Sequence, residues 1–223
     1  MRRLGYFGIA AVTALSITLA GGSPALADGE NVLTSGSLAG ANIAVGDVLT
    51  ASVASGTTAD FDTTLGGTTG VACAASTFVA SVVDNPVAPA TATESTTSQT
   101  FGSCTSNILG VTAVTSAIVN NAPFVTTVAS GTGTVTVTGT DAAPIQTTLV
   151  LRTILGSVTC VYRANGNSIT GVSSNTDNSI SFADQQFNKY SGAITCPSNG
   201  YFSASYAPVL DTTLADSPAV FVN

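Results

Sequence analysis

Apolar and polar side chains alternate with a period of two over several short stretches of this chain. Within residues 77–82, Phe78, Ala80 and Val82 fall on one face, and valines alternate with threonines over residues 131–138. A period of two is typical of a β-strand and is not produced by an amphipathic helix. Because such stretches recur at short intervals with turn-forming residues between them, the pattern predicts an all-β protein.

Similar patterns predict further strands, and no long amphipathic helix or internal repeat interrupts them. The predicted strands are 45–49, 100–104, 111–119, 147–155, 180–182, 190–196, 201–206 and 220–222. Residues 86–99 contain prolines and small polar residues, which predict an extended, exposed connection, with an ordered edge strand as the alternative. We therefore expect one antiparallel β-sandwich, of the jelly-roll or immunoglobulin-like kind, over residues 28–223.

The stretch SVTCVYRANGNSITG, residues 157–171, could be a binding loop or a hairpin. Its cysteine and tyrosine alternate with polar neighbours, and Asn165–Gly166–Asn167 supplies residues that tolerate a positive φ angle. The hairpin interpretation accounts for every one of these residues, whereas a binding loop leaves Cys160 and Tyr162 unexplained. We therefore predict a hairpin with its turn at residues 165–167.

The first 27 residues have the pattern of a secretory signal peptide. Arg2 and Arg3 precede an apolar run that ends in the small residues Ala25–Leu26–Ala27, so we predict cleavage after Ala27. A retained membrane anchor is the alternative, since the run is close to the lower length limit for a spanning helix. The predicted mature protein is secreted or held at the cell surface, with no membrane segment after cleavage.

Charge excludes two classes of partner. Cleavage would leave Arg152, Arg163 and Lys189 as the only basic side chains, against 12 acidic ones in the chain. Nucleic-acid binding needs clustered lysine and arginine, and so does attraction to anionic lipid. We expect neither. Disorder is also disfavoured, because 44% of the residues are hydrophobic.

The predicted mature chain contains four cysteines, Cys73, Cys104, Cys160 and Cys196. An even number of cysteines in an exported chain indicates disulfides, with three possible connectivities. Their spacing favours pairing of neighbours, Cys73 with Cys104 and Cys160 with Cys196. A metal or redox site is disfavoured, because the chain has no C-x-x-C motif and no histidine.

Six short segments resemble a group of small exported actinobacterial proteins of poorly defined function. They are V-A-C-A-A-S-T-F (71–78), T-F-G-S-C (100–104), V-T-C-V-Y (158–162), A-I-T-C-P (193–197), F-S-A-S-Y (202–206) and P-A-V-F-V (218–222). These are framework residues, spread over most of residues 70–223. The resemblance implies a single disulfide-stapled β-sandwich and brings no activity with it.

Catalytic residues are hard to assemble from this sequence. Without histidine, a Ser-His-Asp or Cys-His arrangement cannot form. Asp62 and Asp211 are each followed by two threonines, which faintly resembles the loops of aspartic proteases, but the glycine of those loops is missing. A glycosidase needs two placed carboxylates, and neither Glu30 near the predicted N-terminus nor Glu94 in the predicted connection fits. We expect no enzymatic activity.

Two polar clusters were considered as calcium sites, since Ca²⁺ binds carboxylate and carbonyl oxygens. The clusters are Asp60 with Asp62, and Asn175 with Asp177 and Asn178; neither has the EF-hand spacing. Ordinary turns explain both better, so no cofactor is expected. The absence of tryptophan weakens carbohydrate stacking, although Tyr190 and Tyr201 could form a small platform.

Two functions remain open. The first is a non-enzymatic exported surface or extracellular-matrix protein that self-associates through sheet edges or binds a cell-envelope partner. The alternative is a secreted binding module that holds a small apolar ligand or a partner protein in a cleft. The second hypothesis predicts a ligand-sized apolar pocket, and the sequence does not decide between the two.

Overall fold

The computed structural model describes residues 29–223, so the predicted signal peptide and its cleavage site after Ala27 lie outside the described residues. Within residues 29–223 there is no α-helix, and the only helical element is the short 3₁₀ turn η1 (Asn165–Asn167). Strand residues make up 62% of residues 29–223. The prediction of an all-β protein is therefore confirmed.

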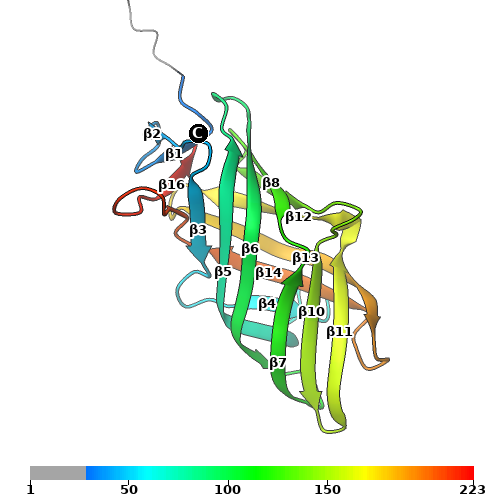
Figure 1. The fold of residues 1–223 in the computed structure, drawn as a ribbon. Coiled ribbons are helices and arrows are strands. Elements are labelled where there is room, and N and C mark those ends of the chain that lie inside the picture. The colour runs from blue at the N-terminus through cyan, green and yellow to red at the C-terminus, as the bar shows by residue number, and fades with distance from the viewer. Residues whose placement is uncertain (1–28) are drawn as a thin grey trace, which may run out of the picture.

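Sixteen strands form two sheets, shown in Figure 1. Their bounds are β1 (Leu33–Ser35), β2 (Ala41–Asn42), β3 (Val48–Ser52), β4 (Ala59–Asp62), β5 (Gly70–Asp84), β6 (Thr91–Ser106), β7 (Val111–Asn120), β8 (Phe124–Ala129), β9 (Thr134–Thr138), β10 (Gln146–Thr153), β11 (Gly156–Ala164), β12 (Ser168–Ser174), β13 (Ser179–Gly192), β14 (Asn199–Tyr206), β15 (Leu210–Asp211) and β16 (Val220–Val222).

The larger sheet has 13 strands and closes on itself, because β5 pairs with β6 and β11 pairs with β13 in addition to the linear strand order. The result is an eight-strand β-barrel. The prediction of a β-sandwich is therefore wrong. Each strand buries one face against the core in a sandwich and in a barrel alike, so the period of two is the same in both.

The barrel wall runs up and down in sequence order, and each wall segment is antiparallel to the next. Several wall segments consist of two strands in succession that lie along the same neighbour. For example, β8 and then β7 pair along β6, at Thr96↔Phe124 and Thr100↔Ile118. The segments are 48–62, 70–84, 91–106, 111–129, 134–153, 156–174, 179–192 and 199–206. Segment 199–206 pairs with 48–62 and closes the ring.

Residues 157–171 do not form the predicted hairpin. Strand β11 pairs with the second half of β13, and β12 pairs with the first half of β13, so the two strands continue along one neighbour. The 3₁₀ turn at 165–167 is a kink in one long wall segment. The Asn167 side chain supports this kink, because its Oδ1 accepts from Ile145 N and its Nδ2 donates to Thr140 O. The turn residues were recognised correctly, but not the direction in which the chain leaves them.

The predicted exposed connection at 86–99 is also wrong. Strand β6 begins at Thr91 and alternates inward and outward, with Ala92, Glu94 and Thr96 buried. Only the segment that contains the prolines, before Thr91, stays outside the strand. The alternative that the sequence left open, an ordered strand, is nearer to the structure, although β6 is paired on both sides.

The three-stranded sheet β16–β1–β2 covers one end of the barrel, which we call the cap end (Figure 1). Strand β16 pairs with β1, so the prediction that 220–222 belongs to a sheet is confirmed. Backbone groups of the cap bond to barrel turns: Val32 N donates to Pro86 O, and Gly131 N donates to Asn223 O. The two ends of the described chain therefore meet at this end.

The opposite end carries both disulfides, and we call it the disulfide end. Cys73 is joined to Cys104 across β5 and β6, and Cys160 of β11 is joined to Cys196. This is the pairing that the spacing favours. Cys196 lies in the turn between β13 and β14, so the predicted strand at 190–196 ends earlier, at Gly192. Two disulfides indicate that the protein folds in an oxidising, extracytoplasmic environment.

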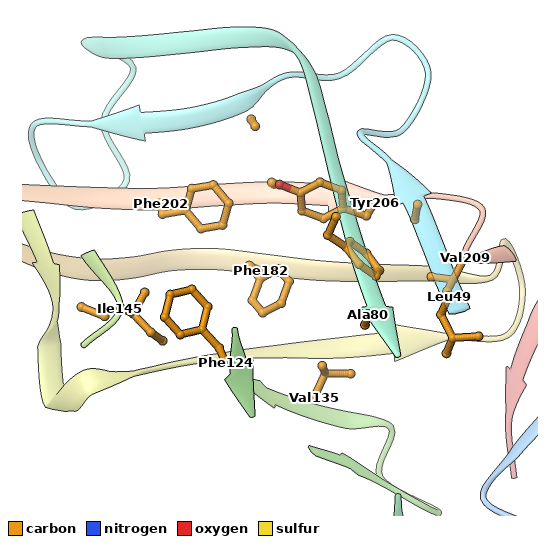
Figure 2. Packing of buried hydrophobic residues seen from close by; sticks show 14 of the residues in the cluster. Leu49, Ala80, Phe124, Val135, Ile145, Phe182, Phe202, Tyr206 and Val209 are labelled. Atoms are coloured by element: carbon orange, nitrogen blue, oxygen red, sulfur yellow. The ribbon is translucent and has the colours of Figure 1, made fainter. Parts of the chain in front are cut away.

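The core lies inside the barrel, where inward-facing side chains from all parts of the wall meet (Figure 2). Phe78, Ala80 and Val82 are buried on one face of β5, and Phe202 and Tyr206 are buried on one face of β14. The alternation predicted for 77–82 and 201–206 is therefore confirmed.

Candidate functional site: the barrel interior

A cavity of about 90 Å³ lies inside the barrel. Seven of the nine phenylalanines of the chain line it: Phe61, Phe78, Phe101, Phe124, Phe182, Phe187 and Phe202. Several of these rings meet edge to face, such as Phe61 with Phe187 at 5.4 Å between centroids. Figure 2 shows Phe124, Phe182 and Phe202 pointing into the interior from different strands. The cavity therefore has a mainly apolar wall in which aromatic rings are prominent; we call it the aromatic cavity.

Glu94 is the acidic side chain buried in this wall. It is 5% exposed and lies on β6 between Val82 of β5 and Thr126 of β8, its register partners. Within residues 29–223 the carboxyl group makes no hydrogen bond or ion pair, and the fully enclosed side-chain atom that lacks a partner is Asp211 Oδ2. Burial raises its pKa to about 7, because loss of water disfavours the charged form.

A second, smaller cavity of about 30 Å³ lies towards the cap end and is lined by Leu33 and Val220 of the cap sheet. Glu94 lines both cavities, together with Phe78, Val135 and Ile180. The carboxyl group therefore lies where the aromatic cavity meets the space beneath the cap.

Most of the other polar side chains of the interior are hydrogen-bonded. The Tyr206 hydroxyl lies 2.9 Å from Ser76 Oγ and accepts from Gln99 Nε2 at 2.9 Å. Thr96 and Thr126 share a hydrogen bond of 2.6 Å between their hydroxyls. Burial raises the pKa of Tyr206 to about 12, so this group stays neutral at ordinary pH. Glu94 differs from these groups because its carboxyl is unpaired.

The carboxylates singled out in the sequence do not come together. Asp62 lies on β4 and pairs with Tyr201, whereas Asp211 lies on β15 beside Leu49. The Oδ1 atom of Asp211 accepts from Thr213 N, which is a turn-capping role. Glu30 is exposed near the cap sheet. No aspartic-protease or glycosidase pair is formed by these residues.

The two polar clusters considered for calcium have different surroundings. Asn175 and Asn178 hold the cap, through bonds to backbone atoms of Val222 and Val220. Asp60 and Asp62 lie near each other, and the pKa of Asp62 is raised by partial burial and by the charges of Asp60 and Asp184. Over residues 29–223, no three acidic, cysteine or histidine residues are grouped so that they could hold a metal ion.

Tyr190 and Tyr201 do not form a platform. Tyr190 is 60% exposed, and the Arg163 guanidinium carbon lies 3.4 Å from the centre of its ring. Tyr201 lies on β14 and pairs with Gln186 of β13. Gln186 is four residues before Tyr190, so the two tyrosines are not neighbours across the strands.

No family model, curated protein or solved structure matches this chain. In the part of the chain that the structure describes, no helix is long and apolar enough to cross a membrane. The candidate site therefore rests on the geometry of the barrel interior alone.

Sequence reasoning considered Glu94 only as a poorly placed catalytic carboxylate. Neither face of residues 91–99 is distinctly apolar, so periodicity could not show which face is buried. The sequence did leave open an ordered strand within residues 86–99. Such a strand places Ala92, Glu94 and Thr96 on one face.

Proposed function

We propose that this chain is an exported, non-enzymatic binding protein whose barrel interior holds one small, largely apolar ligand. The observation that carries the proposal is the aromatic cavity of about 90 Å³. An eight-stranded barrel is just wide enough for its own side chains or for one small ligand. Export is supported by the predicted signal peptide and by the two disulfides.

Leaving such a space empty is costly for a protein core. At roughly 24 cal/mol per Å³ of cavity volume, a void of this size destabilises the fold by about 2 kcal/mol. Exchanging one alanine of the wall for a larger apolar residue would recover part of that free energy. Retention of the cavity is consistent with a bound molecule that fills it.

Binding is favoured over catalysis because Glu94 stands alone. General acid–base catalysis uses a titrating group together with other groups that orient the substrate or stabilise charge. In the described barrel, Tyr206 is already bonded to Ser76 and Gln99, and Thr96 is bonded to Thr126. We therefore propose a binding role without catalysis.

A surface or matrix protein that self-associates is the other function that the sequence suggests. Self-association through sheet edges needs long unpaired strands, and closing a barrel removes them. We therefore rank this function second. Light scattering at high protein concentration tests it, since a mass that stays at one chain would remove it from consideration.

The binding proposal is tested by titrating the oxidised protein with 1-butanol, a small neutral ligand, and following the methyl signals of Val71, Val135 and Ile180 by NMR. We expect saturable shifts at these cavity-lining residues. Ala117 lines the cavity, so Ala117→Leu should abolish the shifts. Ala113→Leu, on the exposed face of the same strand, is the matched control. Shifts that are absent, or that survive Ala117→Leu, would contradict the proposal.

A further inference from the structure

In the described barrel, the interior contains a buried acidic group and no basic group to balance it. Glu94 is a buried carboxyl group without a hydrogen-bond partner among residues 29–223, and seven phenylalanine rings line the same cavity. The face of an aromatic ring carries a partial negative charge. A cation is the complement of both features, because it pairs with a carboxylate and is attracted to aromatic faces.

No basic side chain of the described chain reaches either cavity. Arg163 bonds to Gln146 and stacks on Tyr190 on the outside of the wall. Lys189 donates to Cys196 O, and Arg152 is exposed at the end of β10. The interior therefore lacks the counter-charge that an anionic ligand such as a carboxylate needs, and Glu94 would repel such a ligand.

Other titratable groups near Glu94 are few. No acid or base faces it from its register partners, Val82 of β5 and Thr126 of β8. Elsewhere in the two cavities, the titratable side chains are those of Tyr206 and Asp60, since Cys73 is in a disulfide. The Tyr206 hydroxyl is bonded to Ser76 and Gln99, and the Asp60 carboxylate accepts from Thr58.

We propose that the barrel interior binds a small alkylammonium cation, with its ammonium group on the Glu94 carboxylate and its hydrocarbon chain in the aromatic cavity. This inference rests on the proposed binding function and specifies its ligand class. One carboxylate supplies too few oxygens for Ca²⁺, which takes six to eight ligands. A monovalent organic cation needs only one such group, because its apolar part is held by the rings.

The cavity volumes limit the ligand size. The aromatic cavity has about 90 Å³ and the cavity beneath the cap about 30 Å³. A cavity of roughly 150 Å³ holds benzene, and a water molecule takes roughly 30 Å³ of liquid. The space therefore suits a chain of a few carbon atoms, with the ammonium group at the boundary where Glu94 lies.

The test compares three probes that each contain four carbon atoms but differ in charge: n-butylammonium, 1-butanol and butyrate. Each is titrated calorimetrically into the oxidised protein at pH 8, where Glu94 is mostly ionised, in an amine-free phosphate buffer of fixed ionic strength. We expect butylammonium to bind at least about tenfold more tightly than butanol, as a charge-assisted hydrogen bond allows. Butyrate should not bind measurably.

Glu94→Gln keeps the shape of the side chain and removes its charge. It should weaken butylammonium binding by about tenfold or more and leave butanol binding within about threefold. Glu30→Gln makes the same change at an exposed position and should affect neither ligand. Intermolecular NOEs from the butyl chain to Val135 and Ile180 would place the probe in the cavity.

The outcomes separate the two proposals. If butanol binds and butylammonium binds no better, or if Glu94→Gln leaves the preference unchanged, the cation inference is wrong and the binding function stands. If no probe binds in the interior, both proposals fail. Should Glu94→Gln not fold, the three-probe comparison on the unaltered protein still decides the inference.

Discussion

The two ends of the barrel are held by different chemistry. At the cap end, side-chain amides bind backbone groups of the cap sheet: Asn85 bonds to Leu33 and Ile43, and Asn178 bonds to Val220. At the disulfide end, two covalent links hold the wall. The cap end is covered by a small sheet, whereas the disulfide end is held by covalent links.

The most strongly exposed apolar side chains lie at the disulfide end. Leu109, Ile154, Leu155 and Ile194 lie in turns at the disulfide end and are 78–100% exposed. Apolar side chains of the cap sheet, such as Leu33 and Val220, are 1% and 6% exposed. Burying apolar surface stabilises the cap end by the hydrophobic effect, and the disulfides at the other end stabilise by limiting the unfolded chain. The following predictions test this division.

The largest expected effect is at the disulfide end. Replacing Cys160 and Cys196 together by alanine should lower the free energy of unfolding by about 4 kcal/mol, because the link closes a loop with a sequence separation of 36 residues. The Cys73 and Cys104 double variant, with a separation of 31, should lose nearly the same amount. Urea unfolding measures both, and a loss below about 1 kcal/mol would contradict the entropic account.

Glu94 lies between the two ends and should make stability depend on pH. Its pKa is raised from 4.5 to about 7 in the folded protein, so folding takes up a proton between these values. The contribution of Glu94 to stability is therefore fully present below pH 4.5 and is lost as the pH rises through 7. The loss is about 3 kcal/mol, at 1.36 kcal/mol per pKa unit.

Urea unfolding of the native protein and of Glu94→Gln between pH 4.5 and pH 8 measures this dependence. The variant should lack the downward slope that Glu94 causes. Equal slopes for the two proteins would show that Glu94 is not buried as a lone carboxyl group.

At the cap end, Asn85→Ala should cost about 2–3 kcal/mol, since it leaves buried backbone groups of Leu33 and Ile43 without partners. The matched control is Asn188→Ala, an exposed amide on β13, which should stay within about 0.5 kcal/mol. Hydrogen exchange should also show faster exchange at Leu33 N in Asn85→Ala. Unchanged exchange there would mean that Asn85 does not hold the cap.

The smallest effect is expected at the exposed turns of the disulfide end. Leu109→Ser and Leu155→Ser should each change the free energy of unfolding by less than about 0.5 kcal/mol, because these side chains are 100% and 91% exposed. Leu49→Ala, at a buried position near the cap, should cost about 3 kcal/mol as a contrast. A large loss of unfolding free energy in Leu109→Ser would contradict this prediction. It would mean that Leu109 packs against another molecule in solution.

Local features of the fold could be predicted from the sequence because they depend on near neighbours. The alternation at 77–82 and 201–206 follows from the geometry of a single strand. The cysteine pairing was favoured because each neighbouring pair brackets only a few strands. The turn residues at 165–167 were recognised for the same reason. What failed there was the direction of the outgoing strand, which depends on β13 accepting both β11 and β12 along one edge.

The candidate site could not be predicted, because its residues are far apart in the chain. Glu94 looked exposed when judged by its own neighbours, which are threonines and serines. It is buried because β5 and β8 pair with both edges of β6 and its side chain faces the barrel interior, where residues from distant wall segments line the same cavity. Burial of a side chain is decided by the surfaces that meet it, and local periodicity contains no information about them.

The sequence by itself determined that this protein is built of antiparallel strands linked by two disulfides, because strand alternation and cysteine spacing are local properties of the chain. Only the tertiary structure decided that the strands close into a barrel and that an unpaired carboxyl group faces an aromatic cavity. Both depend on which strands pair across long sequence separations, and the choice between closing one sheet and packing two is made by the whole set of pairings together.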